Sequence, residues 1–144
     1  MKKTVYHYSD RDLKDEEVIT AYRDSFDGLT DAEKIFETAI RAFITNGHKI
    51  RAESLYTWET DRLVRNVWSR MKHKYFYELE IDRDDIVFQA DLNYYNDGAA
   101  AAAAGNALDG IVALYESGES KPDATPRTEI LVKKAIVKRM LLKR

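Results

Sequence analysis

The sequence predicts an α+β fold, in which several helices pack against a β-sheet. Three observations predict it. An aromatic strand-like run, Val5-Tyr6-His7-Tyr8-Ser9, lies near the N-terminus, and an apolar β-branched run, Glu129-Ile130-Leu131-Val132, lies near the C-terminus. The helix and strand patterns between them do not alternate regularly, as they would in a parallel α/β sheet. The chain of 144 residues has the length of one domain, so a single domain spanning residues 1–144 is expected.

The first half of the chain holds two strand patterns and three helical ones. Residues 4–9 form the expected first strand, and residues 13–26 have a weak helical pattern. The strongest helix follows Thr30-Asp31-Ala32-Glu33, a capping-box pattern, and is stopped by Asn46-Gly47. Residues 49–57 read as a strand. A further helix is expected after Thr60, because apolar residues recur at helical spacing from Leu63 to Met71.

The second half begins with two strands and ends with one or two more. Residues 74–81 alternate aromatic or apolar residues with polar ones, and residues 86–92 form the next expected strand after a turn. Six consecutive alanines predict one small-residue helix, residues 99–115, packed closely on the sheet. Residues 116–128 contain one glycine and two prolines and are expected to form the longest loop. Residues 129–142 contain the final strands.

Composition excludes several classes of protein. The chain has no cysteine, so disulfides, thiolate metal sites and cysteine nucleophiles are excluded. The net charge of −2 gives no global attraction to nucleic acid or to anionic membranes. Neither a signal peptide nor a membrane-spanning run is visible, which predicts a cytoplasmic protein with no membrane partner. The three histidines lack metal-ligand spacing, so no metal site is expected, and patterns of serine hydrolases and P-loop enzymes are absent.

Two residues are the main candidates for chemistry, His7 and Glu129. A histidine within a strand is often structural, and a carboxylate at the start of a strand often points outward. The alternative is that the ring of His7 fixes a ribose hydroxyl, while Glu129 points inward at the mouth of a cleft. There a carboxylate would bond a ribose 2-hydroxyl and stabilise an oxocarbenium-like transition state.

Two aromatic residues, Tyr56 and Trp68, can likewise be interpreted as structural or as functional. Tyr56 lies in an expected strand, and Trp68 lies on the apolar stripe of the helix that follows it. Both residue types commonly pack in a core. Together they would also clamp a flat cationic ring by stacking and cation–π attraction, and the two roles are compatible.

Three segments in this order, Val5 to Ser9, Ser54 to Trp68 and Glu129 to Val132, resemble the diphtheria-toxin-like ADP-ribosyltransferases of the His-Tyr-Glu type. Within this family, the chain resembles the small bacterial toxins that modify nucleic acids. The resemblance implies a split, two-sheet fold that binds NAD, as a substrate, in the cleft between the sheets.

The resemblance also implies roles for individual residues. Glu129 would be catalytic. The residues that bind NAD would be His7, Tyr8, Ser9, Tyr56 and Trp68, with His7 on the adenine-side ribose and Tyr56 on the nicotinamide. Trp68 lies one residue beyond the family's usual spacing, which falls on Val67.

The acceptor residues follow from charge and position. Arginine-modifying members of the family usually carry Glu or Gln two residues before the catalytic Glu, whereas this chain has Arg127. With Lys72 and Lys74, Arg127 favours a phosphate-bearing acceptor. We therefore expect a mono-ADP-ribosyltransferase that modifies RNA or DNA somewhat in preference to protein. Family analogy suggests a toxin of a toxin–antitoxin or phage-defence system, with an antitoxin or inhibitor protein as partner. The alternatives are an NAD glycohydrolase and a catalytically silent module that binds a nucleotide or a protein.

Overall fold

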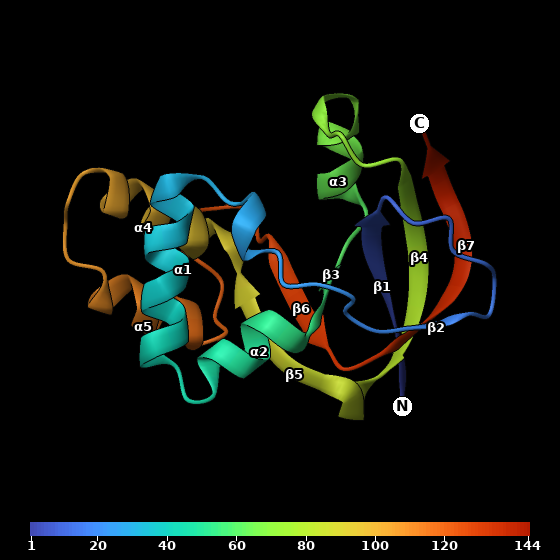
Figure 1. Cartoon of the computed structure of the whole chain (residues 1–144), viewed down its shortest axis with the longest axis horizontal. Coiled ribbons are helices and arrows are strands. Elements are labelled where there is room, and N and C mark those ends of the chain that lie inside the picture. Colours follow the sequence, from blue (N-terminus) through green and yellow to red (C-terminus); the bar gives the residue numbers. More distant parts are fainter.

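A curled, seven-stranded antiparallel sheet forms the centre of the computed structural model, which describes residues 1–144 (Figure 1). The order of its strands is β2-β7-β4-β1-β3-β6-β5, and every neighbouring pair is antiparallel. Helices gather mainly on one side of the β3-β6-β5 part of the sheet, which confirms the predicted α+β class.

The strands are β1 (Lys2–Ser9), β2 (Val18–Ile19), β3 (Leu55–Trp58), β4 (Tyr75–Asp82), β5 (Ile86–Asp91), β6 (Thr128–Val132) and β7 (Ala135–Lys143). The α-helices are α1 (Asp31–Phe43), α2 (Gly47–Glu53), α3 (Arg62–Val67), α4 (Leu92–Ala103) and α5 (Asp109–Glu116). Three short 3-10 helices are η1 (Phe26–Gly28), η2 (Trp68–Arg70) and η3 (Arg83–Asp85). None of the helices combines the length and the apolar character that crossing a membrane requires.

The sheet bends at the seam between β1 and β3. These strands share a single registered pair, Tyr6 with Trp58, whereas β1 and β4 stay paired from Lys2–Asp82 to Ser9–Tyr75. The sheet therefore divides into two halves joined at this seam, β2-β7-β4-β1 and β3-β6-β5 (Figure 1).

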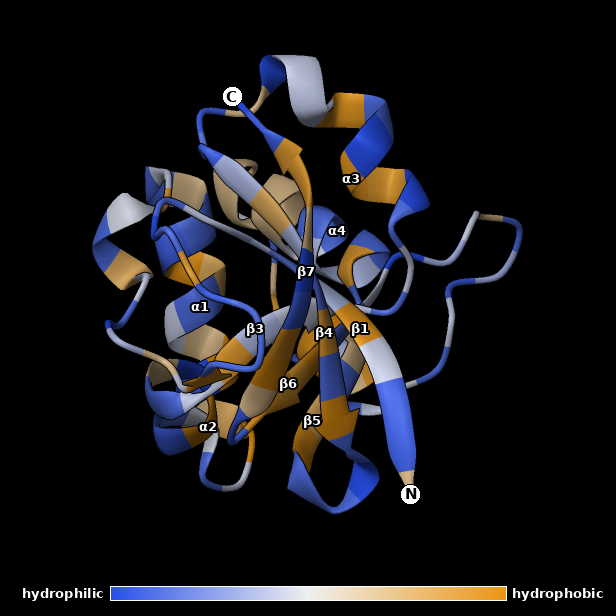
Figure 2. Cartoon of the chain, turned by 90° about the vertical axis from the view of Figure 1, so that its right-hand side faces the viewer, coloured by the Kyte–Doolittle hydropathy of each residue, from blue (hydrophilic) through white to orange (hydrophobic).

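Two hydrophobic cores hold the halves and the helices together. The first draws residues from both halves of the sheet, among them Val5, Leu79 and Ile130, all fully buried. The second joins β5 to α1, α4 and α5 through residues such as Phe36, Ala90 and Tyr115. Figure 2 shows hydrophobic residues along the crossing strands, while the lysine-bearing start of β1 is hydrophilic. Successive side chains along a strand point to opposite faces, so the two faces of the sheet contribute to different cores.

The capping box at the start of α1 is present as predicted. Thr30 Oγ1 accepts a hydrogen bond from the backbone N–H of Glu33, and the Glu33 carboxylate accepts one from the backbone N–H of Thr30. This arrangement satisfies two N–H groups that a helix start leaves unpaired. The chain leaves the helix after Phe43, and Asn46 adopts the left-handed conformation with φ of 56° before α2 begins.

Two expectations for the first half were wrong. Residues 13–26 do not form a helix; they contain β2, whose Val18 and Ile19 pair with Ile136 and Ala135 of β7. Residues 49–57 are not one strand, because α2 continues to Glu53 and β3 starts only at Leu55. In the first case, pairing with β7 outweighs a weak local helical pattern.

The alanine-rich segment also differs from the expectation. It forms two helices, α4 and α5, separated around Gly105, which has a φ of +72°. In this helical layer, α4 packs closely against α1. A Cβ on Gly98 would lie 2.2 Å from an atom of the Phe36 ring, so only glycine allows this approach.

Candidate functional site

Three adjacent strands carry the three segments singled out in the sequence. β3 lies between β1 and β6, and the register aligns Tyr6, Trp58 and Glu129 across these strands. Residues paired in this way share a face of the sheet, as do residues two apart along a strand. Tyr8, Trp58 and Glu129 therefore belong to one face, and the Tyr8 and Trp58 ring centroids are 6.2 Å apart.

His7 lies at the seam where β1 and β3 diverge. Its Nδ1 lies 2.8 Å from the backbone carbonyl oxygen of Tyr56. Burial lowers the pKa of His7 to about 4, so the ring is neutral near pH 7. A carbonyl oxygen only accepts hydrogen bonds, so Nδ1 carries the proton and Nε2 presents a lone pair. That Nε2 is buried and has no partner in the protein.

Glu129 is 7% exposed, and one of its oxygens is occupied. Its Oε1 accepts hydrogen bonds from Arg51 Nη1 at 3.2 Å and from the Tyr115 hydroxyl at 3.3 Å. Its Oε2 accepts none from the protein, and it is not among the fully buried polar atoms. Burial raises the pKa of Glu129, although the charge of Arg51 acts in the opposite direction.

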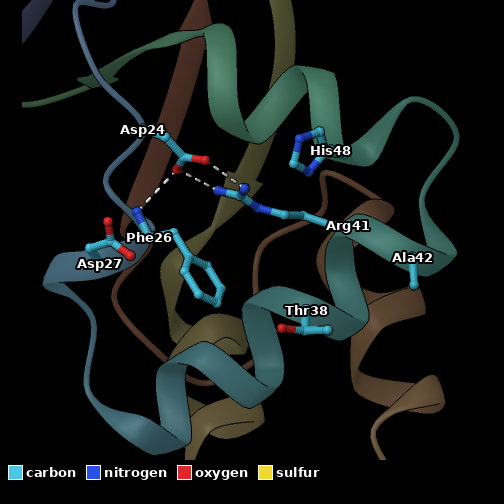
Figure 3. Close-up of a pocket in the computed structure, with 7 residues that line it drawn as sticks. All are labelled: Asp24, Phe26, Asp27, Thr38, Arg41, Ala42 and His48. Atoms are coloured by element: carbon cyan, nitrogen blue, oxygen red, sulfur yellow. Dashed lines mark hydrogen bonds and ion pairs between the residues drawn. The ribbon is translucent and has the colours of Figure 1, made fainter.

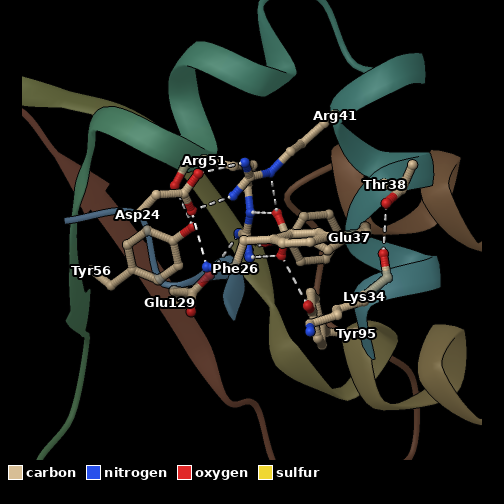
Figure 4. A network of polar contacts seen from close by, with 11 residues as sticks. Asp24, Phe26, Lys34, Glu37, Thr38, Arg41, Arg51, Tyr56, Tyr95 and Glu129 are labelled. Atoms are coloured by element: carbon tan, nitrogen blue, oxygen red, sulfur yellow. Dashed lines mark hydrogen bonds and ion pairs between the residues drawn. The ribbon is translucent and has the colours of Figure 1, made fainter. Parts of the chain in front are cut away.

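Arg51, on α2, joins Glu129 to a second buried carboxylate, Glu37 of α1 (Figure 4). Arg51 donates from Nε and Nη2 to the two oxygens of Glu37, at 2.7 and 2.8 Å. Glu37 also accepts from the Tyr95 hydroxyl at 2.9 Å and from Arg41 Nε at 3.2 Å. Although burial acts to raise it, these bonds hold the pKa of Glu37 below its ordinary value.

The two carboxylates thus share one guanidinium unequally. Glu37 receives the bidentate pair, which is the stronger form of an arginine–carboxylate contact. Glu129 receives one longer bond. The lowered pKa of Glu37 and the raised pKa of Glu129 agree with this division. Such a buried network is costly to form and fixes the geometry of its members.

The two aromatic residues expected to clamp nicotinamide have separate surroundings. The Tyr56 hydroxyl donates to the backbone carbonyl of Arg51 at 2.7 Å, and the Arg51 Cζ lies 4.9 Å from the centre of the Tyr56 ring. Trp68 lies in η2, with Arg144 4.5 Å from its ring centre and Phe76 beside it. The tryptophan aligned with Glu129 is Trp58.

The predicted acceptor residues also fall into two groups. Arg127 directly precedes β6; its backbone N–H donates to Asp91, and its guanidinium makes no hydrogen bond within the protein. Burial, together with the charge of Glu129, raises the pKa of Tyr8 to about 12, and the charge of Arg127 opposes this. Lys72 and Lys74 are exposed and flank His73, whose ring centre is 4.4 Å from that of Tyr8. Tyr8 therefore lies between both groups.

Ser9 closes the end of β1. It is 4% exposed, and its Oγ accepts a hydrogen bond from the backbone N–H of Arg11 at 3.0 Å. Its immediate role in the structure is to hold the turn after β1.

Sequence reasoning missed Glu37 and Arg51 as members of the site. The signal for Glu37 was available, because it is an acidic residue between Phe36 and Ile40 on the buried side of α1. The signal for Arg51 was hidden by the expectation of a strand at residues 49–57, since only a helix there turns Arg51 toward α1.

A pocket of about 550 Å³ borders the buried network through Arg41, which donates to Glu37 (Figure 3). Its lining comes from η1 and its approach, from α1 and from the start of α2: Asp24, Phe26, Asp27, Thr38, Arg41, Ala42 and His48. Asp24 and Arg41 form a bidentate ion pair with two bonds of 2.8 Å at its edge. The pocket thus contains none of the residues expected to bind NAD.

Comparison with models of protein families finds none that matches this chain, and comparison with curated proteins finds no match either.

Proposed function

We propose that this chain is an NAD-dependent mono-ADP-ribosyltransferase with a split, two-sheet fold. The observation that carries the proposal is that only β3 separates the strands of His7 and Glu129, and that each of the two residues presents a polar atom without a protein partner. By the alternation along β1, His7 leaves the strand on the face opposite to Tyr8 and Glu129, and it reaches the seam between β1 and β3, where its Nδ1 bonds the carbonyl oxygen of Tyr56. His7 Nε2 is a hydrogen-bond acceptor at the seam of the sheet. Glu129 shares a face of the sheet with Trp58 and Tyr8, and its Oε2 is a carboxylate oxygen without a protein donor. Acceptor atoms of this kind suit the hydroxyl groups of the two riboses of NAD.

The reaction follows from the chemistry of these groups. The bond between the nicotinamide nitrogen and its ribose carbon breaks, and the bonding electrons leave with nicotinamide, which departs neutral. The carbon becomes oxocarbenium-like, and the Glu129 carboxylate stabilises the positive charge while accepting a hydrogen bond from the 2-hydroxyl. A nucleophilic atom of the acceptor then bonds to that carbon and releases its proton to solvent.

We propose nucleic acid, rather than protein, as the acceptor, and a toxin of a toxin–antitoxin or phage-defence system as the setting. Support for the acceptor comes from Arg127, whose guanidinium makes no hydrogen bond within the protein and which lies two residues before Glu129. Arg127 directly precedes β6, and the charges of both Arg127 and Glu129 act on Tyr8, so a phosphate bound by Arg127 would bring the acceptor toward the reacting carbon.

The experiment is transfer from labelled NAD by the purified chain. RNA, DNA and cell extract serve as acceptors in parallel, and each product is digested with nuclease or protease. Label that is released by nuclease supports the proposal, and label that is released only by protease indicates a protein acceptor. Nicotinamide release without labelled product would identify an NAD glycohydrolase.

A specific observation favours a second candidate, a catalytically silent binding module. Glu129 is buried and paired with Arg51, which is also how a purely structural carboxylate would be held. Such a module would bind NAD or ADP-ribose but release no nicotinamide. Binding without turnover in the experiment above would select it.

A further inference from the structure

Four buried nitrogen atoms near the end of β1 have no hydrogen-bond partner in the protein. They are His7 Nε2, Arg11 Nε, Arg11 Nη2 and His73 Nδ1. Folded proteins pair more than about nine-tenths of such groups. The three residues are also near one another. Arg11 follows the end of β1, where its N–H bonds Ser9, and the ring centre of His73 is 4.4 Å from that of Tyr8, the neighbour of His7. An unpaired cluster of this kind calls for a ligand with matching polar atoms.

Arg11 presents the edge of its guanidinium that binds oxyanions. Nε and Nη2 lie on the same side of the planar group and can donate two parallel hydrogen bonds to a phosphate. The guanidinium is stacked on Tyr22, with Cζ 3.9 Å from the ring centre. The backbone of Arg11 is fixed at both ends, because Ser9 Oγ accepts from its N–H and the Tyr77 hydroxyl donates to its carbonyl oxygen at 2.8 Å. This donor pair is therefore held in place before a ligand binds.

His73 and Asp10 complete the surroundings. The side chain of His73 is 33% exposed, so the cluster of buried nitrogens lies next to the protein surface. Its Nδ1 lies 3.6 Å from Asp10 Oδ2, which is too long for a hydrogen bond. The other oxygen of Asp10 accepts from the backbone N–H of Lys74 at 3.1 Å. Lys72 and Lys74 lie on either side of His73 in the chain, so cations outnumber the single carboxylate here.

We propose that this cluster is a binding site for a ribose phosphate group. The fork of Arg11 binds the phosphate, His73 Nδ1 contributes a further contact, and His7 Nε2 accepts a hydrogen bond from a ribose hydroxyl. Only a ligand with both an oxyanion and a hydroxyl satisfies the donor fork and the histidine acceptor together. For NAD the oxyanion is the pyrophosphate, and this identification of the ligand rests on the proposed function. The anion site itself rests on the unpaired nitrogens.

The test measures binding of inorganic pyrophosphate and of ADP-ribose to the full chain by calorimetry. Arg11→Met removes the fork, and Arg11→Lys keeps the charge without it. Arg23→Met is the matched control, because exposed Arg23 lies over the same Tyr22 ring at 5.4 Å. We expect Arg11→Met to weaken binding of both probes by about tenfold or more, as loss of hydrogen bonds to a charged group does. The affinity of Arg11→Lys for the two probes should be intermediate. The affinity of Arg23→Met should stay within about twofold of that of the unsubstituted chain.

Several outcomes would overturn the site. It fails if the unsubstituted chain binds neither probe saturably, if Arg11→Met binds both as tightly as before, or if Arg23→Met loses as much as Arg11→Met. Circular dichroism checks that Arg11→Met is folded. If that variant is unfolded, unchanged binding of both probes by Arg11→Lys overturns the site instead. Binding that depends on Arg11, without any transfer or nicotinamide release from NAD, supports the site and contradicts the proposed function. If Arg11→Met transfers ADP-ribose from NAD with an unchanged KM, the result supports the proposed function and contradicts the site.

Discussion

At the scale of the residue, the geometry around Glu129 is set by competition for Arg51. Glu37 takes both parallel N–H groups of the guanidinium, and Glu129 takes one bond through Oε1. A carboxylate held through one oxygen keeps the other for a ligand. Arg51 therefore acts as a positioning residue for Glu129. Its removal would leave the buried Glu129 without a cationic partner and Glu37 with Arg41 alone, which is strongly destabilising.

Glu129→Gln is expected to lower transfer from NAD by about a hundredfold or more, with little change in folding or in NAD binding. The amide keeps the size and one acceptor oxygen but removes the negative charge, and such electrostatic stabilisation is worth roughly 3–4 kcal/mol. Single-turnover nicotinamide release measures the loss, while calorimetry and thermal unfolding check binding and stability. A folded variant with nearly full activity would show that Glu129 is structural.

Arg127→Ala is expected to impair transfer to nucleic acid while hydrolysis of NAD by water continues. The salt dependence of transfer should also flatten by about one log–log unit, because one phosphate contact is lost. Arg83→Ala, at an exposed arginine of η3, serves as the control. If both activities fall together in Arg127→Ala, the residue belongs to the NAD site or to the fold instead.

At the scale of the element, the contact between α4 and α1 depends on one glycine. Gly98 faces the ring of Phe36, and three atoms of that ring would lie 2.2–2.3 Å from an added Cβ. Phe36 is fully buried in the same core as Tyr95 and Tyr115, whose hydroxyls bond Glu37 and Glu129. The close approach of these helices therefore supports the buried network beside β6.

Gly98→Ala is expected to destabilise the protein by about 1–3 kcal/mol, because overpacking displaces Phe36. Gly110→Ala in α5 is the matched control, since nothing lies within 4 Å of its added Cβ. There the better helix propensity of alanine should stabilise the protein by up to about 1 kcal/mol. Urea unfolding of both variants measures the difference, and equal stabilities would contradict the helix contact described above.

At the scale of the whole molecule, stability is expected to fall as the pH is lowered below neutral. The pKa of His7 is about 4 in the folded state and 6.5 ordinarily, so the unfolded chain binds a proton first. The stabilisation is complete above pH 6.5 and is lost as the pH falls toward 4. Glu37 and Asp91 have lowered pKa values, so their contributions are lost below about 4.5 and 3.8. The raised pKa of Glu129 acts in the opposite sense.

Replacing His7 should flatten this profile. Between pH 6.5 and 4 the contribution of His7 changes by at most about 1.4 kcal/mol per pH unit. Urea unfolding of His7→Gln at several values of pH should show a smaller decline over this range than the unsubstituted chain. His48→Gln, at an exposed histidine, is the control and should leave the decline unchanged. Identical profiles for all three proteins would mean that His7 is not buried in its neutral form.

The sequence by itself determined the α+β class, the capped helix α1, and the strands β1, β4, β5 and β6, because local periodicity, capping residues and aromatic alternation act over a few neighbouring residues. It also drew attention to His7 and Glu129. Only the tertiary structure decided that residues 18–19 join the sheet, that residues 47–53 are helical and that Arg51 links Glu37 to Glu129. Arg51 and Glu129 are 78 residues apart, and His73 comes beside Tyr8 of β1 only through the pairing of β1 with β4. Such contacts depend on strand pairing and burial across the whole chain, which no local pattern encodes.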